Sequence, residues 1–188
     1  VFLWQGGWAL TGGKYAMSGA VAGYFLYMLA FMDTAATIPT GSMAERWKWK
    51  SFVLWGLFCG AIYYPLFGAW TWGGGWLSQL GNTLKLGNGY VDFAGSGVVH
   101  AVGGVAALTG AMVIGPRIGK YGKDGKARGI PGHSIAMAGA GTLILFFGWF
   151  GFNAGSTLQI ADGQFALVAA NTAIAAALGG LVAMFWVW

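Results

Sequence analysis

The chain has 188 residues, of which 57% are hydrophobic and only 8% are charged. Soluble domains carry about 25% charged residues, so this composition excludes an ordinary water-soluble globule. The 35 glycines follow no Gly-X-Y period, and large apolar residues are abundant, which excludes collagen and a disordered linker. The net charge of +5 comes from few basic residues on little polar surface, so nucleic acid is not an expected partner.

Both ends of the chain look like cuts within a longer sequence. The chain begins at Val1, with no initiator Met and no basic segment followed by a cleavage site. It ends at Trp188 inside an apolar stretch. We therefore expect residues 1–188 to be a partial membrane domain of a longer protein.

Five apolar segments are long enough to cross a bilayer, which requires about 20 residues in a helix. They span roughly residues 15–40, 51–72, 93–116, 132–156 and 164–188. Four of them contain no Lys, Arg, Asp or Glu, and the first contains Asp33. The predicted fold class is all-α, a polytopic bundle of membrane helices.

The basic residues gather in alternate connections, as five spans require. The first and third connections hold eight of the 10 basic residues, whereas the opposite side holds Lys14 and Lys85. The positive-inside rule then places residues 41–50 and 117–131 in the cytoplasm. We expect the protein to be integral to the plasma membrane. The third connection is either a solvated loop or a docking surface for an anionic lipid or a regulatory partner.

Two polar residues mark the third predicted span. Asp92 has the residue type and position of a helix N-cap that satisfies unpaired amide groups. His100 follows eight residues later, inside the span, where an imidazole needs partners and is by default a functional candidate. Helical spacing places His100 on a face of small residues, with valines opposite. The two sets are Gly97, Gly103, Gly104, Ala107, Gly110 and Ala111, and Val98, Val102, Val105 and Met112.

Three interpretations of His100 remain open from the residues alone: a structural histidine, a pore or transfer site, and a haem ligand. Haem requires a second axial ligand, but no other histidine lies within a predicted span. His133 sits beside Pro131 at the mouth of the fourth span, as an interfacial residue. No metal or cofactor is therefore expected, and no pattern indicates an enzyme.

Aromatic and hydroxyl residues gather at the outer ends of two spans. Phe152 and Ser156 are four residues apart on one helical face, and Gly148, Gly151 and Gly155 form a stripe for close packing. Trp72 precedes three glycines. These residues form either an interfacial aromatic belt or a site where an aromatic face and a hydroxyl bind a small cation.

Asp33 is an acidic residue within the first predicted span. An unpaired carboxylate in hydrocarbon costs several kcal/mol. We expect Asp33 to form a structural hydrogen bond with a neighbouring helix.

Three segments resemble the ammonium transporter family (Amt/Mep/Rh). Asp92-Phe-Ala-Gly-Ser-Gly-Val-Val-His100 is similar to the signature of its fifth transmembrane helix. Gly41-Ser-Met-Ala-Glu45-Arg46 resembles its motif after the third helix, and Trp149-Phe-Gly-Phe-Asn-Ala-Gly-Ser156 its sixth-helix motif. The resemblance covers nearly the whole chain and implies helices three to seven of about eleven.

The resemblance implies a role for each matching residue. His100 matches the first of two pore-lining histidines, and Asp92 matches the acidic residue at the outer end of that helix. Phe31 and Phe152 match a stacked phenylalanine gate. Trp72 and Ser156 match an external site that recruits ammonium, although the segment between Trp72 and Asp92 is longer than in compact family members.

The implied function is transport of ammonium or ammonia through a hydrophobic pore in each subunit of a homotrimer. Membrane lipid and a cytoplasmic PII-type regulatory protein are the other implied partners. An ammonium sensor coupled to a signalling module is the first alternative, and a haem-binding membrane protein is the second.

Overall fold

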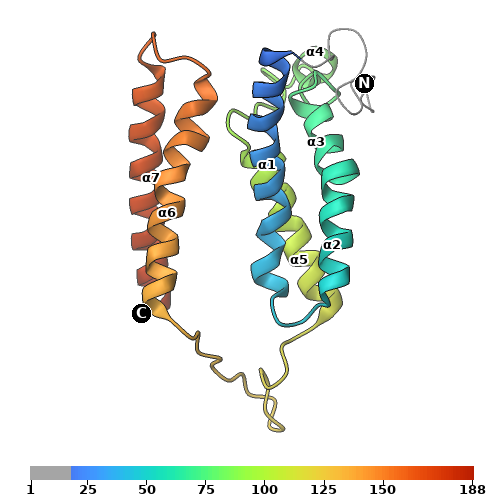
Figure 1. Cartoon of the computed structure of the whole chain (residues 1–188), viewed down its shortest axis with the longest axis vertical. Coiled ribbons are helices and arrows are strands. Elements are labelled where there is room, and N and C mark those ends of the chain that lie inside the picture. Colours follow the sequence, from blue (N-terminus) through green and yellow to red (C-terminus); the bar gives the residue numbers. More distant parts are fainter. Residues whose placement is uncertain (1–17) are drawn as a thin grey trace. The chain divides into compact units, whose positions relative to one another are not determined.

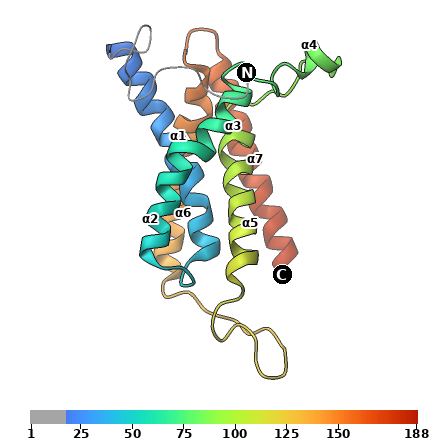
Figure 2. The same cartoon turned by 90° about the vertical axis from the view of Figure 1, so that its right-hand side faces the viewer.

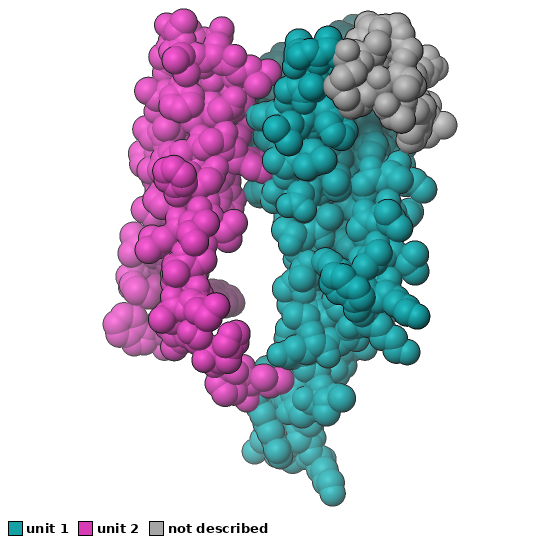
Figure 3. All heavy atoms as spheres, viewed as in Figure 1, with its two compact units in different colours: residues 1–128 teal, residues 129–188 magenta. Residues whose placement is uncertain are grey.

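The computed structural model describes residues 18–188 (Figure 1). The chain divides into two compact units, residues 1–128 and residues 129–188, which Figure 3 colours separately. Each unit is described here by itself. Lys14 and the first residues of the first predicted span lie outside the described residues.

All regular structure among residues 18–188, apart from one β-bridge between Tyr121 and Ala127, is helical. Five helical segments are long and apolar enough to span a membrane, which confirms the predicted fold class. They are Gly19–Met43, Trp49–Thr71, Ser96–Ile114, Ile135–Thr157 and Gln164–Val187. Each boundary lies within a few residues of the position expected from hydropathy.

Helices α1, α2 and α3 form the first two spans. Helix α1 (Gly19–Met43) begins where the hydroxyl of Ser18 accepts a hydrogen bond of 3.3 Å from the amide of Val21. The second span is one continuous helix of α2 (Trp49–Phe58), a π-helical turn η3 (Cys59–Tyr63) and α3 (Tyr64–Thr71).

Pro39 lies inside α1 and removes one backbone donor, which frees carbonyl groups in the preceding turn. The indole Nε1 of Trp55, from α2, donates a 2.9 Å hydrogen bond to the carbonyl of Ala36. This bond satisfies a carbonyl beside the proline and ties α1 to α2.

The third span starts with a π-helical turn, η4 (Ser96–Ala101), and continues as α5 (Val102–Ile114). Figures 1 and 2 show α5 running beside α1. Two glycines allow this approach: Gly103 faces Ile38, and Gly110, seven residues on, faces Met43. The hydroxyl of Ser42 also donates a 3.1 Å hydrogen bond to the carbonyl of Ala107. Small residues therefore let two membrane helices pack at close range.

The predicted facing of this span is wrong in part. Val98 and Val102, expected opposite the packed face, are buried, whereas Gly104 is exposed. The π-helical turn causes the difference, because i to i+5 bonding adds a residue to the turn and rotates the following residues relative to a regular α-helix. His100 is consequently half-buried rather than at the centre of the packed face.

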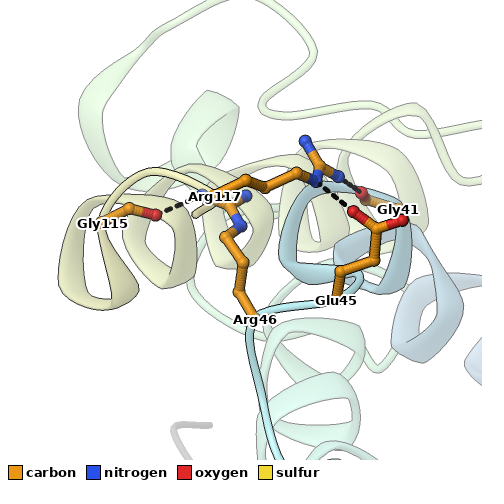
Figure 4. Close-up of polar contacts among 5 residues, drawn as sticks. All are labelled: Gly41, Glu45, Arg46, Gly115 and Arg117. Carbon is orange, nitrogen blue, oxygen red and sulfur yellow. Dashed lines mark hydrogen bonds and ion pairs between the residues drawn. The ribbon is translucent and has the colours of Figure 1, made fainter. Parts of the chain in front are cut away.

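The first and third connections meet at one end of the first unit (Figure 4). The Nε of Arg117 lies 3.1 Å from a carboxylate oxygen of Glu45, and its Nη2 donates a 3.3 Å hydrogen bond to the carbonyl of Gly41. The guanidinium of Arg46 donates to the carbonyl of Gly115. These contacts place both basic connections on the same side, as the charge pattern predicts.

A folded loop joins α3 to η4 at the opposite end and carries the short helix α4 (Leu80–Leu84) (Figure 2). The outgoing and returning parts of this loop lie side by side, because the amide of Tyr90 donates a 3.0 Å hydrogen bond to the carbonyl of Leu77. The long segment between Trp72 and Asp92 is thus an ordered loop that returns the chain to the start of η4.

The second unit is a helical hairpin of α6 (Ile135–Asn153), a 3₁₀ turn η5 (Ala154–Thr157) and α7 (Gln164–Val187). Asn153 donates a 3.1 Å hydrogen bond to the hydroxyl of Thr172, which joins the two helices. The predicted close packing of Gly148, Gly151 and Gly155 does not occur here, because a Cβ at each would meet no described atom within 4 Å.

The contact between α1 and α5 predicts opposite effects on stability when either of two adjacent glycines is replaced by alanine. A Cβ at Gly103 would lie 2.7 Å from the Cβ of Ile38, whereas one at Gly104 would meet nothing within 4 Å. We expect Gly103→Ala to destabilise the full-length protein by about 1–3 kcal/mol through overpacking. Gly104→Ala should leave stability unchanged or raise it slightly. Thermal unfolding in detergent measures both, and equal losses would contradict this packing.

Candidate functional site

A buried aspartate organises the start of the third span. Both carboxylate oxygens of Asp92 accept backbone hydrogen bonds: Oδ1 from Gly95 at 2.6 Å and Ser96 at 3.0 Å, and Oδ2 from Gly97 at 2.8 Å and Val98 at 2.7 Å. These amides include the first ones of η4, which have no acceptor within the helix. The helix begins at Ser96, four residues after Asp92. The Asp92 carboxylate therefore accepts from the first amides of the helix without occupying the N-cap position next to it.

Glycines shape the backbone around this carboxylate. Gly95 has a φ of 94°, a conformation that other residues rarely adopt, and this turns the chain into η4. Gly97 lies against the phenol of Tyr90, so a side chain there would collide with it. Partial desolvation raises the pKa of Tyr90, and the nearby Asp92 carboxylate raises it further. Tyr90 therefore stays neutral beside the negative charge at physiological pH.

The carbonyl of Asp92 also fixes Trp72. The indole Nε1 donates a 2.7 Å hydrogen bond to it, across 20 residues of sequence. Three glycines follow Trp72, and the amide of Gly73 bonds the carbonyl of Gly68 at 2.9 Å, which ends α3 at this point. Trp72 is half-buried and held at the end of the first unit opposite the two basic connections.

An aromatic cluster forms around Phe31. Its ring lies edge-on to Trp72 with 5.9 Å between the centroids, and the centroid of the Tyr27 ring lies 4.5 Å from that of Phe31. Phe31 is only 2% exposed. The sequence motifs do not single out Tyr27, although its position four residues before Phe31 puts both rings on one face of α1.

His100 lies in η4, on the helix that Asp92 starts. Its backbone amide bonds the carbonyl of Gly95 at 3.0 Å, five residues back, so the π-turn sets the direction of the imidazole. The other histidine, His133, is exposed in the connection before α6. Within residues 18–188 no group of three His, Cys, Asp or Glu side chains could hold a metal ion.

The remaining predicted site residues belong to the second unit. Phe152 and Ser156 are both half-buried at the end of α6 and in η5. The hydroxyl of Ser156 donates a 2.6 Å hydrogen bond to the carbonyl of Phe152, which uses its proton and leaves its oxygen oriented as an acceptor. The first unit brings Phe31, Trp72, Asp92 and His100 together on neighbouring helices, and the second holds Phe152 and Ser156 as a separate pair.

Asp33 does not form the expected bond to a neighbouring helix within the described chain. Its side chain is exposed, and it makes no hydrogen bond or ion pair with residues 18–188.

The helices and this site define a polytopic α-helical membrane protein with an aromatic cluster and an intramembrane histidine at one end of its bundle. A model of the Ammonium Transporter Family matches residues 3–188. The chain belongs to the ammonium transporter family, as the three motifs predicted.

Known ammonium transporters and a solved structure are among the proteins similar to this chain. The ammonium transporter Amt2 of Archaeoglobus fulgidus is 50% identical over 192 residues, covering 98% of this chain and 41% of the relative. Ammonium transporter 1 member 2 of Arabidopsis thaliana is 45% identical, covering 77% and 29% respectively. A solved structure titled "Sensor Amt Protein" has a TM-score of 0.78 and 42% identity, covering 87% of this chain and 40% of that one. The chain thus spans between 29% and 41% of the length of these proteins.

The four bonds to Asp92 predict a large effect of Asp92→Asn. Asparagine replaces one carboxylate oxygen by an amide nitrogen, which cannot accept the hydrogen bonds of the two backbone donors that face it. About half of the charge-assisted bonds would therefore be lost, at about 1.5–3 kcal/mol each. We expect a loss of roughly 3 kcal/mol or more in the stability of the full-length protein. Thermal unfolding in detergent measures it.

Asp162→Asn is the matched control. The Asp162 carboxylate accepts hydrogen bonds from Gln159 and Gln164 in an exposed loop, where water can replace them. That variant should change stability by less than about 1 kcal/mol. A similar small change for Asp92→Asn would show that the carboxylate does not hold η4 in place.

Proposed function

We propose that this chain is part of a protein that moves ammonium or ammonia across a membrane through a hydrophobic pore. Its family and the printed names of Amt2 and its relatives support this function. The observation that carries the proposal is the fixed group of Phe31, Trp72 and Asp92 at the start of the helix that holds His100. Such a group offers an aromatic surface to a cation directly above a histidine-containing helix.

Trp72 and Ser156 recruit the cation in this proposal. Ammonium and potassium are similar in size and charge, so selectivity must use the N–H bonds of ammonium and its removable proton. The face of Trp72 attracts a cation, and the oxygen of Ser156 accepts an N–H bond. The indole N–H already donates to Asp92, so its ring is held in one orientation for this contact.

Phe31 and Phe152 form the gate, and His100 lines the pathway beyond it. A dry, aromatic constriction disfavours a charged species, so ammonium would give up its proton near the gate. The imidazole of His100 then exchanges hydrogen bonds with ammonia along an otherwise apolar path. Tyr27 extends the aromatic surface that precedes this gate.

The family membership also supports a proposal for the location and assembly of the protein. We place the protein in the plasma membrane as a homotrimer, with residues 41–50 and 117–131 on the cytoplasmic side by the positive-inside rule. The cytoplasmic end joined by Arg117 and Glu45 is the side available to a PII-type regulatory protein.

An ammonium sensor is the second candidate function. The solved structure titled "Sensor Amt Protein" supports it, because it shares 42% identity and a TM-score of 0.78 with this chain. Both functions use the same cation site, and a signalling domain in the full-length gene would favour the sensor.

Changing the recruitment residues tests the cation site. Trp72→Leu and Ser156→Ala in the full-length protein should each raise the apparent half-saturation for methylammonium uptake. Losing one cation-π contact costs about 0.5–2 kcal/mol, which corresponds to roughly a 2- to 30-fold increase. Trp76→Leu is the control, since Trp76 lies edge-on to Trp70 at the same end of the first unit. An unchanged half-saturation in both site variants would reduce these residues to interfacial aromatics and structural hydroxyls.

Changing His100 tests the pore. His100→Ala should abolish or strongly reduce ammonium flux while the protein still assembles. His100→Glu should retain some flux but admit potassium, because a fixed negative charge stabilises any small cation in the pore. Ammonium and potassium currents of purified protein in liposomes measure both. Normal flux and selectivity in both variants would leave His100 a packing residue.

A further inference from the structure

Asn153 lies between Phe152 and Ser156, at the point where α6 ends. It is the last residue of α6, and the chain continues as the tighter 3₁₀ turn η5. Neighbouring residues point about 100° apart around an α-helix and about 120° apart around a 3₁₀-helix. The rotation of the chain at Asn153 therefore decides where the side chains of both Phe152 and Ser156 point.

The side chain of Asn153 fixes this rotation against α7. Its Nδ2 donates a 3.1 Å hydrogen bond to Oγ1 of Thr172, and Figure 1 shows α6 and α7 running side by side. Thr172 is only 9% exposed, and it and Ala154 are the two buried residues among residues 129–188. The bond thus lies where the hairpin of α6 and α7 encloses its side chains.

The hydroxyl of Thr172 determines which way the amide of Asn153 faces. The single hydroxyl proton is used in a 2.8 Å hydrogen bond to the carbonyl of Val168. The hydroxyl oxygen is then an acceptor, so the amide nitrogen of Asn153 and not its oxygen must face Thr172. An apolar side chain of the same shape at either position would remove this bond and leave the other polar group unpaired.

The neighbouring hydroxyl groups have a different effect. Ser156 donates to the carbonyl of Phe152 at 2.6 Å, and Thr157 donates to the carbonyl of Ala154 at 2.9 Å. These bonds stay within the turn and fix its shape. The bond from Asn153 crosses to α7 and fixes the direction in which that turn faces.

We propose that Asn153 is a positioning residue for the cation site. By bonding Thr172 it directs Phe152 toward the gate and Ser156 toward the recruited cation. This inference rests on the roles proposed above for Phe152 and Ser156. Asn153 acts through these two neighbours and requires no contact of its own with the cation.

Hydrogen exchange in the full-length protein tests the positioning independently of transport. Asn153→Leu and Thr172→Val should each speed amide exchange in residues 154–158 by roughly 5-fold or more, because each leaves a partly buried polar group unpaired. Thr172→Ser keeps the hydroxyl and should exchange like wild type. Thr142→Val is the matched control, since its hydroxyl bonds the carbonyl of Ala138 on its own helix at 2.8 Å. Unchanged exchange in both site variants would overturn the proposal.

Uptake of methylammonium by the same variants tests the consequence for the cation site. Asn153→Leu and Thr172→Val should each raise the apparent half-saturation by roughly 3- to 10-fold, and Thr172→Ser should restore it. The double variant should be no worse than either single one, because both remove the same bond. A lower maximal rate with an unchanged half-saturation would show a merely structural role and overturn the proposal, as would multiplied effects in the double variant.

Ser156→Ala separates this inference from the proposed function. If Asn153 acts through Ser156, adding Thr172→Val to Ser156→Ala should raise the half-saturation no further. If Ser156→Ala and Trp72→Leu raise the half-saturation but Thr172→Val does not, the positioning role alone is wrong. If none of the three variants changes it, the cation site itself is wrong, whatever the exchange rates show.

Discussion

The Asp92 carboxylate is the constraint on which the described site depends. One side chain accepts from four consecutive amides, and three of these four charge-assisted bonds are buried. A membrane helix cannot leave its first amides without acceptors where solvent is absent. The four hydrogen bonds to the Asp92 carboxylate therefore permit the span to begin at Ser96 with a π-helical turn, and that turn sets the orientation of His100.

The same residue connects three helices. Its carbonyl accepts from Trp72 at the end of α3, and Trp72 in turn lies edge-on to Phe31 on α1. The side-chain and main-chain oxygens of Asp92 thus position both the histidine helix and the aromatic cluster. A change at Asp92 is expected to disturb both together, because they share one anchor.

The α1 helix has two faces with different requirements. One face holds Phe31 in the aromatic cluster and packs against α5 through Gly103 and Gly110. The other face carries Asp33 and Thr37, which are exposed in the first unit.

The local pattern of the sequence was enough to predict the five spans, the shared side of the two basic connections and the family. Hydropathy and charge are local properties, and a bilayer imposes them on each segment separately. The facing of His100, the bond from Trp72 to Asp92 and the packing of Tyr27 on Phe31 required the tertiary structure. The reason is that a π-turn and contacts across 20 residues depend on where other helices place their donors and acceptors, which regular α-helical periodicity does not encode.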